Sequence, residues 1–177
     1  MDSLRKRLID SGPAPFKDFM ASALYDINGG YYSTNIREVG RTGDFSTSST
    51  LNHSLANAIA SWVRKILREN KKLPHSIIEI GAGNGSLAQQ IVKKIGFWSR
   101  LKMQYHIVEK SEPLLKLQVQ RLGKGKRFQW HRDPGSALRS CSGKAIIISN
   151  ELIDAFPVEL IQWEEQTERW RKVMIRF

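Results

Sequence analysis

Cysteine is nearly absent from this sequence. Cys141 is the only cysteine among 177 residues, so no disulfide can form within the chain and a cysteine-based metal site is disfavoured. The histidines are scattered without the spacing of metal ligands, at His53, His75, His106 and His131. We therefore predict no metal site and a reducing compartment, and we assign the histidines no catalytic role.

Long apolar runs are also missing. No stretch approaches the roughly 20 apolar residues that a membrane span requires, and the opening MDSLRKRLIDSG lacks the apolar segment of a secretory signal. The acidic residues Asp2 and Asp10 disfavour a mitochondrial presequence. We predict no membrane association and a bacterial cytoplasmic location, with the mitochondrial matrix as the alternative.

Negative charge is sparse relative to positive charge. The 28 Lys and Arg residues outnumber the 17 Asp and Glu residues, and the net charge of +11 favours an anionic partner. The basic residues concentrate at 64–72, 93–102 and 116–132, without zinc-finger spacing or interleaved aromatic residues for stacking bases. We interpret them as solvated helix faces and turns, and keep nucleic acid as the less favoured partner.

The length suits one domain with a sizeable core and a small appendage. Apolar residues recur at helical spacing over residues 2–11, 16–24 and 51–66. In the third segment Leu55, Ile59 and Trp62 fall on one face. Before it lies the glycine-rich stretch GRTGDFSTSST. We therefore predict an N-terminal helical cap over residues 1–72 that contains one glycine-rich loop.

Short apolar strands alternate with helices from residue 76 onward. Strands are predicted at 77–80, 105–108, 128–130 and 145–148, with helices at 87–95 and 113–122 and a short turn at 135–138. Such alternation predicts a parallel sheet with helices on its faces. Two more strands are predicted at 158–163 and 170–177. The fold class is therefore α/β, with a Rossmann-like sheet domain over residues 73–177.

The stretch IIEIGAGNGSLAQQI, residues 77–91, reads as a strand, a tight glycine turn and a helix start. The glycines lie at alternating positions, and the dinucleotide fingerprint would need its third glycine at Ser86. The spacing therefore favours S-adenosylmethionine over a dinucleotide. The free N–H groups of the helix start suit a carboxylate. Glu79 could accept from the ligand's ammonium group or hold the loop; a turn for packing alone is the alternative.

The next predicted strand ends at Glu109. An acid at this strand end is placed to bind both ribose hydroxyls of a nucleoside ligand. The alternatives are a surface pair with Lys110 or a capping role before Ser111. At the end of the third strand, Trp130 and His131 could border an adenine. Dinucleotides and S-adenosylmethionine share the ribose acid, so Glu109 does not separate them.

The fourth predicted strand runs into SNELIDAFPV, which carries Asn150, Glu151 and Asp154. Two carboxylates beside a methyl donor suit a cationic acceptor. A guanidinium has a pKa above about 12, and carboxylates could grip its N–H groups and localise its charge. One nitrogen could then attack the methyl group while a carboxylate receives the proton. Helix capping and ordinary turn acids are the alternative.

Five segments in register give the sequence a resemblance to the MidA-like (mitochondrial dysfunction protein A) methyltransferases. They are PFKDFMASALYDINGGYY, GRTGDFSTS, EIGAGNGSLAQQI, YHIVEKSEPLLKLQ and SNELIDAFPV. The resemblance implies a class I S-adenosylmethionine-dependent fold with an N-terminal helical addition. It also implies symmetric dimethylation of arginine, and hence a protein partner that presents an arginine.

The resemblance also implies roles for individual positions. The cofactor would be held by Glu79, Gly81, Ala82, Gly83, Gly85 and Glu109. The GRTGDF loop would lie over cofactor and substrate through Gly40, Gly43 and Asp44. The family's Asn-Glu and the following Asp-Ala match Asn150, Glu151 and Asp154, which would be the catalytic residues.

The sequence departs from the family in two places. Ser49 and Thr50 stand where the family commonly has Pro-Glu, and the family's chains continue beyond Phe177. We therefore expect the C-terminal part of the sheet to be missing here. Other functions stay open: methyl transfer to another acceptor such as RNA, and a catalytically silent cofactor-binding assembly factor. An NAD oxidoreductase is disfavoured by Ser86.

Overall fold

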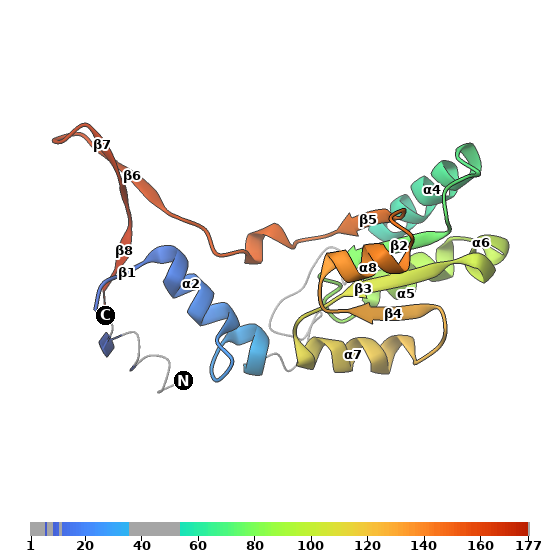
Figure 1. Ribbon diagram of the computed structural model, residues 1–177, viewed down its shortest axis with the longest axis horizontal. Coiled ribbons are helices and arrows are strands. Elements are labelled where there is room, and N and C mark those ends of the chain that lie inside the picture. Colours follow the sequence, from blue (N-terminus) through green and yellow to red (C-terminus); the bar gives the residue numbers. More distant parts are fainter. Residues whose placement is uncertain (1–5, 7–8, 11, 36–53, 177) are drawn as a thin grey trace. The chain divides into compact units, whose positions relative to one another are not determined.

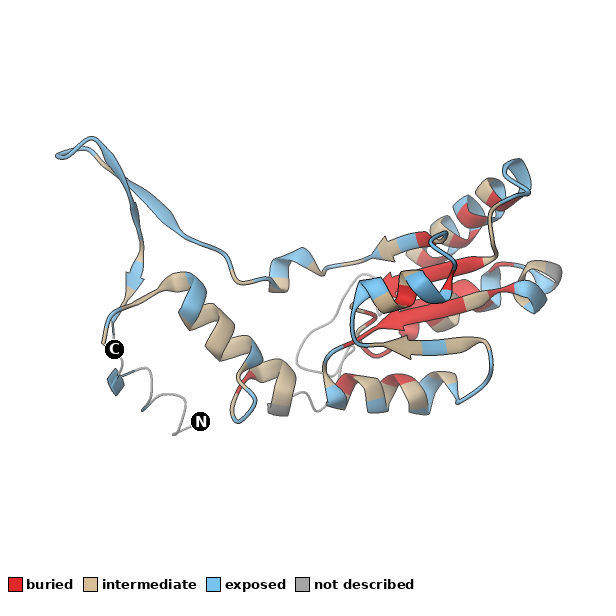
Figure 2. Cartoon of the chain, viewed as in Figure 1, coloured by how far each residue is buried: buried red, intermediate tan, exposed pale blue. Residues whose placement is uncertain are grey.

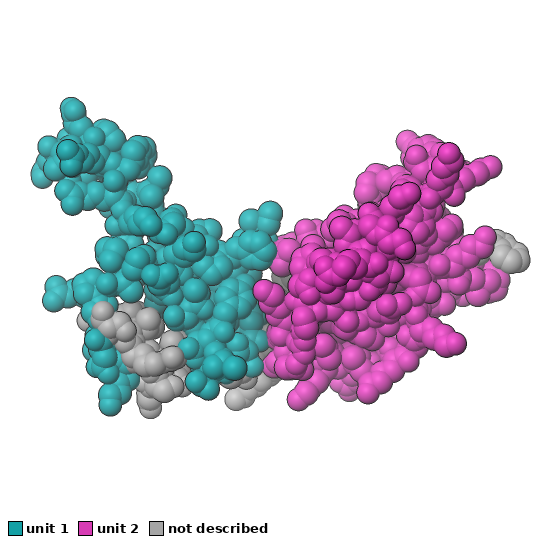
Figure 3. Space-filling view, viewed as in Figure 1, with its two compact units in different colours: residues 1–36, 153–177 teal, residues 37–152 magenta. Residues whose placement is uncertain are grey.

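The computed structural model describes residues 6, 9–10, 12–35 and 54–176 (Figure 1). The chain forms two compact units, coloured separately in Figure 3. The sheet unit is Arg37–Leu152, and the hairpin unit combines Met1–Ile36 with Ile153–Phe177. In the described part of the chain, no helix has both the length and the apolar character needed to span a bilayer.

Four parallel strands in the order β4-β3-β2-β5 form the sheet unit's framework. Their bounds are β2 Ser76–Ile80, β3 Gln104–Val108, β4 Phe128–His131 and β5 Ile146–Ser149. Ile80 aligns with Val108 on one side and with Ser149 on the other, so these three strands end at one edge. The predicted α/β, Rossmann-like fold class is confirmed.

Helices cover both faces of this sheet (Figure 1). They are α4 Ser54–Glu69, α5 Ser86–Lys94, α6 Phe97–Lys102, α7 Glu112–Leu122 and α8 Pro134–Ser140. Side chains alternate along a strand. Ile77 therefore packs into a core with α4 and α5, whereas Ile78 packs against α8. Figure 2 shows the buried residues gathered in this unit's strands and inner helix faces.

The buried face of α4 is centred beside the predicted one, and Leu55 and Ile59 of the predicted face are partly buried against the same core. Its buried residues are Ala56, Ala60, Val63 and Leu67. Trp62 is 50% exposed. Because alanines occupy the contact, α4 can pack closely against α5. The larger apolar side chains, on which the predicted face was based, flank this contact. The short helix α6 was not predicted.

The hairpin unit brings together the two ends of the sequence. Its elements are β1 Ala14–Pro15, α2 Phe16–Tyr25, η1 Tyr31–Asn35, η2 Ile153–Ala155, β6 Ile161–Glu164, β7 Arg169–Lys172 and β8 Met174–Ile175. Strand β1 pairs antiparallel with β8, and the Tyr25 hydroxyl donates to the Ala155 carbonyl at 2.6 Å. In the β6–β7 hairpin Trp163 lies opposite Trp170 with ring centroids 5.4 Å apart.

The borders of the two units differ from the predicted segments 1–72 and 73–177. Helix α4, expected in the cap, packs on α5 in the sheet unit. Residues 153–177, expected in the sheet domain, pair instead with the N-terminal segment through β1 and β8. Long-range strand pairing and helix packing decide these borders, and neither leaves a local signal in the sequence.

Candidate functional site

The glycine loop joins the end of β2 to the start of α5. Gly81, Gly83 and Gly85 all have left-handed backbones, with φ of 72°, 54° and 78°. A Cβ added to Gly81 would lie 2.7 Å from Leu152 Cδ1, whereas one added to Gly83 has no described atom within 4 Å. The loop is therefore closed by a side chain at Gly81 and open at Gly83, where a ligand could approach the backbone.

Glu79, two residues before the loop, is buried beside an aromatic hydroxyl. Its exposed fraction is 2%, and the Tyr105 hydroxyl donates to Glu79 Oε2 at 2.7 Å. Burial raises the pKa of Glu79 to about 7, although the hydrogen bond from Tyr105 opposes the shift. Burial also raises the pKa of Tyr105 well above its usual value. The expected contact between Glu79 and a ligand stays a prediction.

Glu109 follows β3 at the same edge of the sheet as the glycine loop. The Ser111 amide donates to its Oε1 at 2.9 Å, and Gln118 Nε2 donates to its Oε2 at 3.0 Å. Burial raises the pKa of Glu109, against the lowering effect of these hydrogen bonds and the charge of Arg132. Each carboxylate oxygen has two lone pairs, so Glu109 can accept a hydrogen bond from a ligand in addition to those from Ser111, Gln118 and the Lys110 backbone.

Gln118 on α7 is a site residue that the sequence analysis missed. Its side chain is fully buried, and Nε2 also donates to the Gly83 carbonyl at 2.8 Å. Its Oε1 accepts from the Trp130 indole N–H at 3.1 Å. Gln118 lies four residues after the buried Leu114, on the inner face of the same helix. A glutamine at a helix position that should be apolar was the available signal.

Two histidines meet on the opposite face of the sheet. His106 Nδ1 and His131 Nε2 are 2.9 Å apart, so one ring donates a hydrogen bond to the other. Burial lowers the pKa of His106, helped by the charge of His131. Burial also lowers the pKa of His131, against the effect of Asp133. In the described part of the chain, no three His, Cys, Asp or Glu residues are grouped so as to hold a metal ion.

The predicted catalytic residues fall in both units. Asn150 and Glu151 directly follow β5, whose Ser149 aligns with Ile80, so both lie at the edge that carries the glycine loop. Glu151 is exposed, and its φ of 49° is uncommon for a residue with a side chain. Asp154 is an exposed residue of η2 in the hairpin unit. The predicted loop residues Gly40, Gly43 and Asp44 lie outside the described residues.

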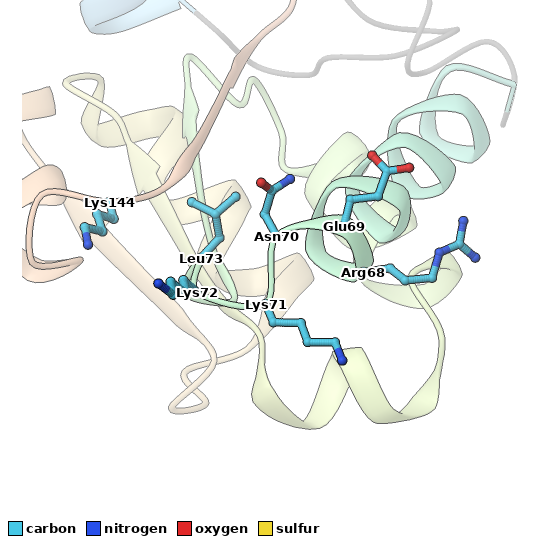
Figure 4. Close-up of a pocket in the computed structure, with 7 residues that line it drawn as sticks. All are labelled: Arg68, Glu69, Asn70, Lys71, Lys72, Leu73 and Lys144. Carbon is cyan, nitrogen blue, oxygen red and sulfur yellow. The ribbon is translucent and has the colours of Figure 1, made fainter.

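A pocket of about 540 Å³ lies at the other, amino edge of the sheet (Figure 4). Its residues come from the end of α4, the turn into β2 and the turn before β5; they are Arg68, Glu69, Asn70, Lys71, Lys72, Leu73 and Lys144. Ligands of open α/β sheets bind at the carboxyl edge, so this basic pocket is not the predicted cofactor site.

A protein-family comparison supports S-adenosylmethionine over a dinucleotide as the cofactor. The family model described as "Putative S-adenosyl-L-methionine-dependent methyltransferase" matches residues 55–177. The chain belongs to this family. The match covers the sheet, the glycine loop and all of the predicted catalytic residues, and it confirms the resemblance to MidA-like methyltransferases.

Two named relatives match nearly the whole length of this chain. The mitochondrial "protein arginine methyltransferase NDUFAF7 homolog" of Drosophila melanogaster is 27% identical over 97% of the chain. The protein of the same name from Caenorhabditis elegans is 23% identical over 97% of the chain. The chain spans only 43% and 46% of the lengths of these relatives.

Solved structures show the same fold. A Burkholderia thailandensis protein bound to S-adenosyl-homocysteine has a TM-score of 0.75 and 25% identity, covering 99% of this chain and 49% of that one. A native structure from the same organism has a TM-score of 0.69 and 23% identity, covering 99% of this chain and 48% of that one. Its likeness supports the fold alone.

The burial of Glu79 predicts a pH-dependent stability. Its pKa of about 7 in the folded chain lies above the ordinary 4.5, so the folded state keeps the proton up to a higher pH than the unfolded state does. The free energy of unfolding should fall as pH rises from about 4.5 to 7, by up to about 3 kcal/mol. Glu79→Gln keeps an acceptor for Tyr105 but cannot titrate. In urea unfolding, the free energy of unfolding of the variant minus that of wild type should therefore be more positive at pH 8 than at pH 4.5.

The control for this experiment is Glu69→Gln, which changes an exposed carboxylate of the same unit. Its stability difference from wild type should stay nearly constant between the two pH values. A Glu79→Gln difference that is equally constant would contradict the assigned proton equilibrium.

The glycine loop predicts unequal effects of two matched substitutions. Gly81→Ala and Gly83→Ala both place a side chain on a left-handed backbone, which costs about 1 kcal/mol. Only Gly81→Ala also pushes against Leu152, adding about 1 kcal/mol if the leucine must shift. Urea unfolding measures both, and Leu152→Ala should recover part of the loss in the Gly81→Ala background. Equal losses without recovery would rule out this contact.

Proposed function

We propose that the carboxyl edge of the sheet unit binds S-adenosylmethionine, and that the chain carries the cofactor-binding part of a methyltransferase. The observation that carries this proposal is the open backbone at Gly83 beside the buried Glu109. Family membership supports the cofactor class, as does the S-adenosyl-homocysteine bound to the 25% identical Burkholderia protein.

The roles follow from the groups at this edge. The backbone of the glycine loop, with Gly81, Ala82, Gly83 and Gly85, would surround the amino-acid end of the ligand. The first N–H of α5, that of Ser86, already donates to Asn84 Oδ1, so the ligand's carboxylate would depend on the other N–H groups of the loop and helix start. Glu109 would accept from the ribose hydroxyls with its remaining lone pairs. When bound, the cofactor supplies a methyl group on a positively charged sulfur.

We propose a protein arginine as the methyl acceptor. The names of the two curated relatives support this substrate, as does the resemblance described above. Glu151 would draw the guanidinium to the edge that holds the cofactor, with Asn150 beside it. A carboxylate that binds two N–H groups localises the positive charge and leaves the attacking nitrogen richer in electrons. The role of Asp154 as a second carboxylate stays a prediction from the sequence.

Other expectations also remain proposals. Gly40, Gly43 and Asp44 are proposed to cover the cofactor. The partner is proposed to be a protein that presents an arginine. The curated relatives are named as mitochondrial, and the bacterial cytoplasmic location of this chain stays a prediction.

Calorimetric titration with S-adenosyl-homocysteine tests the cofactor site. Wild type should bind in the micromolar range. Gly83→Ala should weaken binding about tenfold or more because its methyl group enters the open space, and Glu109→Gln should weaken it about tenfold through weaker bonds to the ribose. Lys71→Ala, in the pocket at the amino edge, is the control and should bind like wild type. A folded wild-type chain that binds NADH but not S-adenosyl-homocysteine would overturn the proposal.

A methyl-transfer assay tests the acceptor. Labelled S-adenosylmethionine is incubated with the chain and either arginine-containing protein or RNA, and the product is identified by mass spectrometry. Glu151→Gln should reduce transfer to arginine by roughly 100-fold, or about 3 kcal/mol, while affinity for S-adenosyl-homocysteine changes less than about threefold. Label in RNA, or undiminished transfer by Glu151→Gln combined with Asp154→Asn, would contradict the proposed acceptor chemistry.

A further inference from the structure

The buried amide of Gln118 connects three separate parts of the sheet unit. It contacts the glycine loop at the Gly83 carbonyl, the strand end at Glu109 Oε2, and β4 at the Trp130 indole. These residues are 35, 9 and 12 positions away in sequence. Its side chain has no exposed surface, so it acts through these protein groups and touches no ligand.

The orientation of this amide is determined by its neighbours. An indole N–H can only donate a hydrogen bond, so the oxygen of Gln118 must face Trp130. The Gly83 carbonyl and the ionised Glu109 carboxylate can only accept hydrogen bonds. The NH₂ group must therefore face both of them. A flipped amide would place an oxygen against two acceptors. Trp130 therefore fixes which way the NH₂ group points.

The amide also has an energetic reason to be there. A buried carboxylate and a buried carbonyl each need a hydrogen-bond partner. One NH₂ group satisfies both of them, at 2.8 and 3.0 Å, and thereby holds the loop and the acid at a set separation. An apolar side chain of the same size would fill the space but would leave the carbonyl, the carboxylate and the indole without this partner.

We propose that Gln118 is a positioning residue that sets the glycine loop and Glu109 in the relative arrangement needed to bind the amino-acid end and the ribose of an S-adenosylmethionine-type ligand. This inference rests on the proposed cofactor site. One NH₂ hydrogen bond occupies a lone pair of Glu109 Oε2 and the other occupies the Gly83 carbonyl, so the carboxylate is held with its remaining lone pairs available to a ligand. Selectivity for the ribose hydroxyls therefore depends on Gln118, although Gln118 does not reach the ribose.

The test compares two ligands across matched variants. The ligands are S-adenosyl-homocysteine and its 2′-deoxyribose analogue, measured by calorimetry. Gln118→Met keeps the length of the side chain and removes its hydrogen bonds. Trp130→Phe keeps an aromatic ring, although a smaller one, and removes the indole donor that fixes the amide. Gln129→Met is the control, because Gln129 is an exposed glutamine that bonds only to Gln104 among the contacts seen.

We expect wild type to prefer S-adenosyl-homocysteine over the deoxy analogue about tenfold. Gln118→Met should weaken S-adenosyl-homocysteine binding about tenfold but the analogue less than about threefold, which nearly abolishes the preference. Trp130→Phe should partly reduce the preference for S-adenosyl-homocysteine. This variant serves as the test if Gln118→Met does not fold. Gln129→Met should leave both affinities unchanged.

Two failures can be told apart. If wild type binds and prefers the ribose ligand but Gln118→Met and Trp130→Phe weaken both ligands equally, Gln118 has only a structural role and this inference is overturned. If folded wild type binds neither ligand, the proposed cofactor site fails, and the role of Gln118 fails with it.

Discussion

Strand β2 is hydrogen-bonded on both sides, to β3 and to β5, and the candidate site depends on this double pairing. Because Ile80 aligns with both Val108 and Ser149, the residues that follow these three strands emerge together at one edge. The glycine loop, Glu109 and Asn150 come from distant parts of the sequence, and strand register alone brings them to that edge. Helices on both faces then exclude water from the strands.

Burial of the strands forces polar groups inside the unit to find protein partners. Glu79 is paired with Tyr105, and His106 is paired with His131. Both pairs join neighbouring strands. Their side chains lie on opposite faces of the sheet, one among the apolar residues under α4 and α5, the other on the face covered by α8. Such pairs specify the partner of each strand, since an unpaired buried polar group is costly.

The sequence was sufficient for what depends on local pattern. The strands were predicted because apolar runs such as 77–80 end at glycine or acidic residues, and the loop because glycines at alternating positions separate a strand from a helix start. It was not sufficient for contacts between distant segments. Gln118 was missed because its three partners are remote in sequence. The centre of the buried face of α4 was missed because Ala56 and Ala60 are small. The border after Leu152 was missed because the following segment pairs with the other end of the chain.

The pocket at the amino edge shows where part of the chain's excess positive charge is located. Within the sheet unit, Lys71, Lys72, Lys102 and Lys144 lie at the amino edge, whereas the carboxyl edge carries Glu112, Asp133 and Glu151 together with Lys110 and Arg132. The amino edge is therefore the more basic of the two. Acidic groups at the carboxyl edge attract cations, and the proposed cofactor and the proposed acceptor are both cations. A uniformly basic surface would repel them, so the distribution of charge matters more to encounter than its sum.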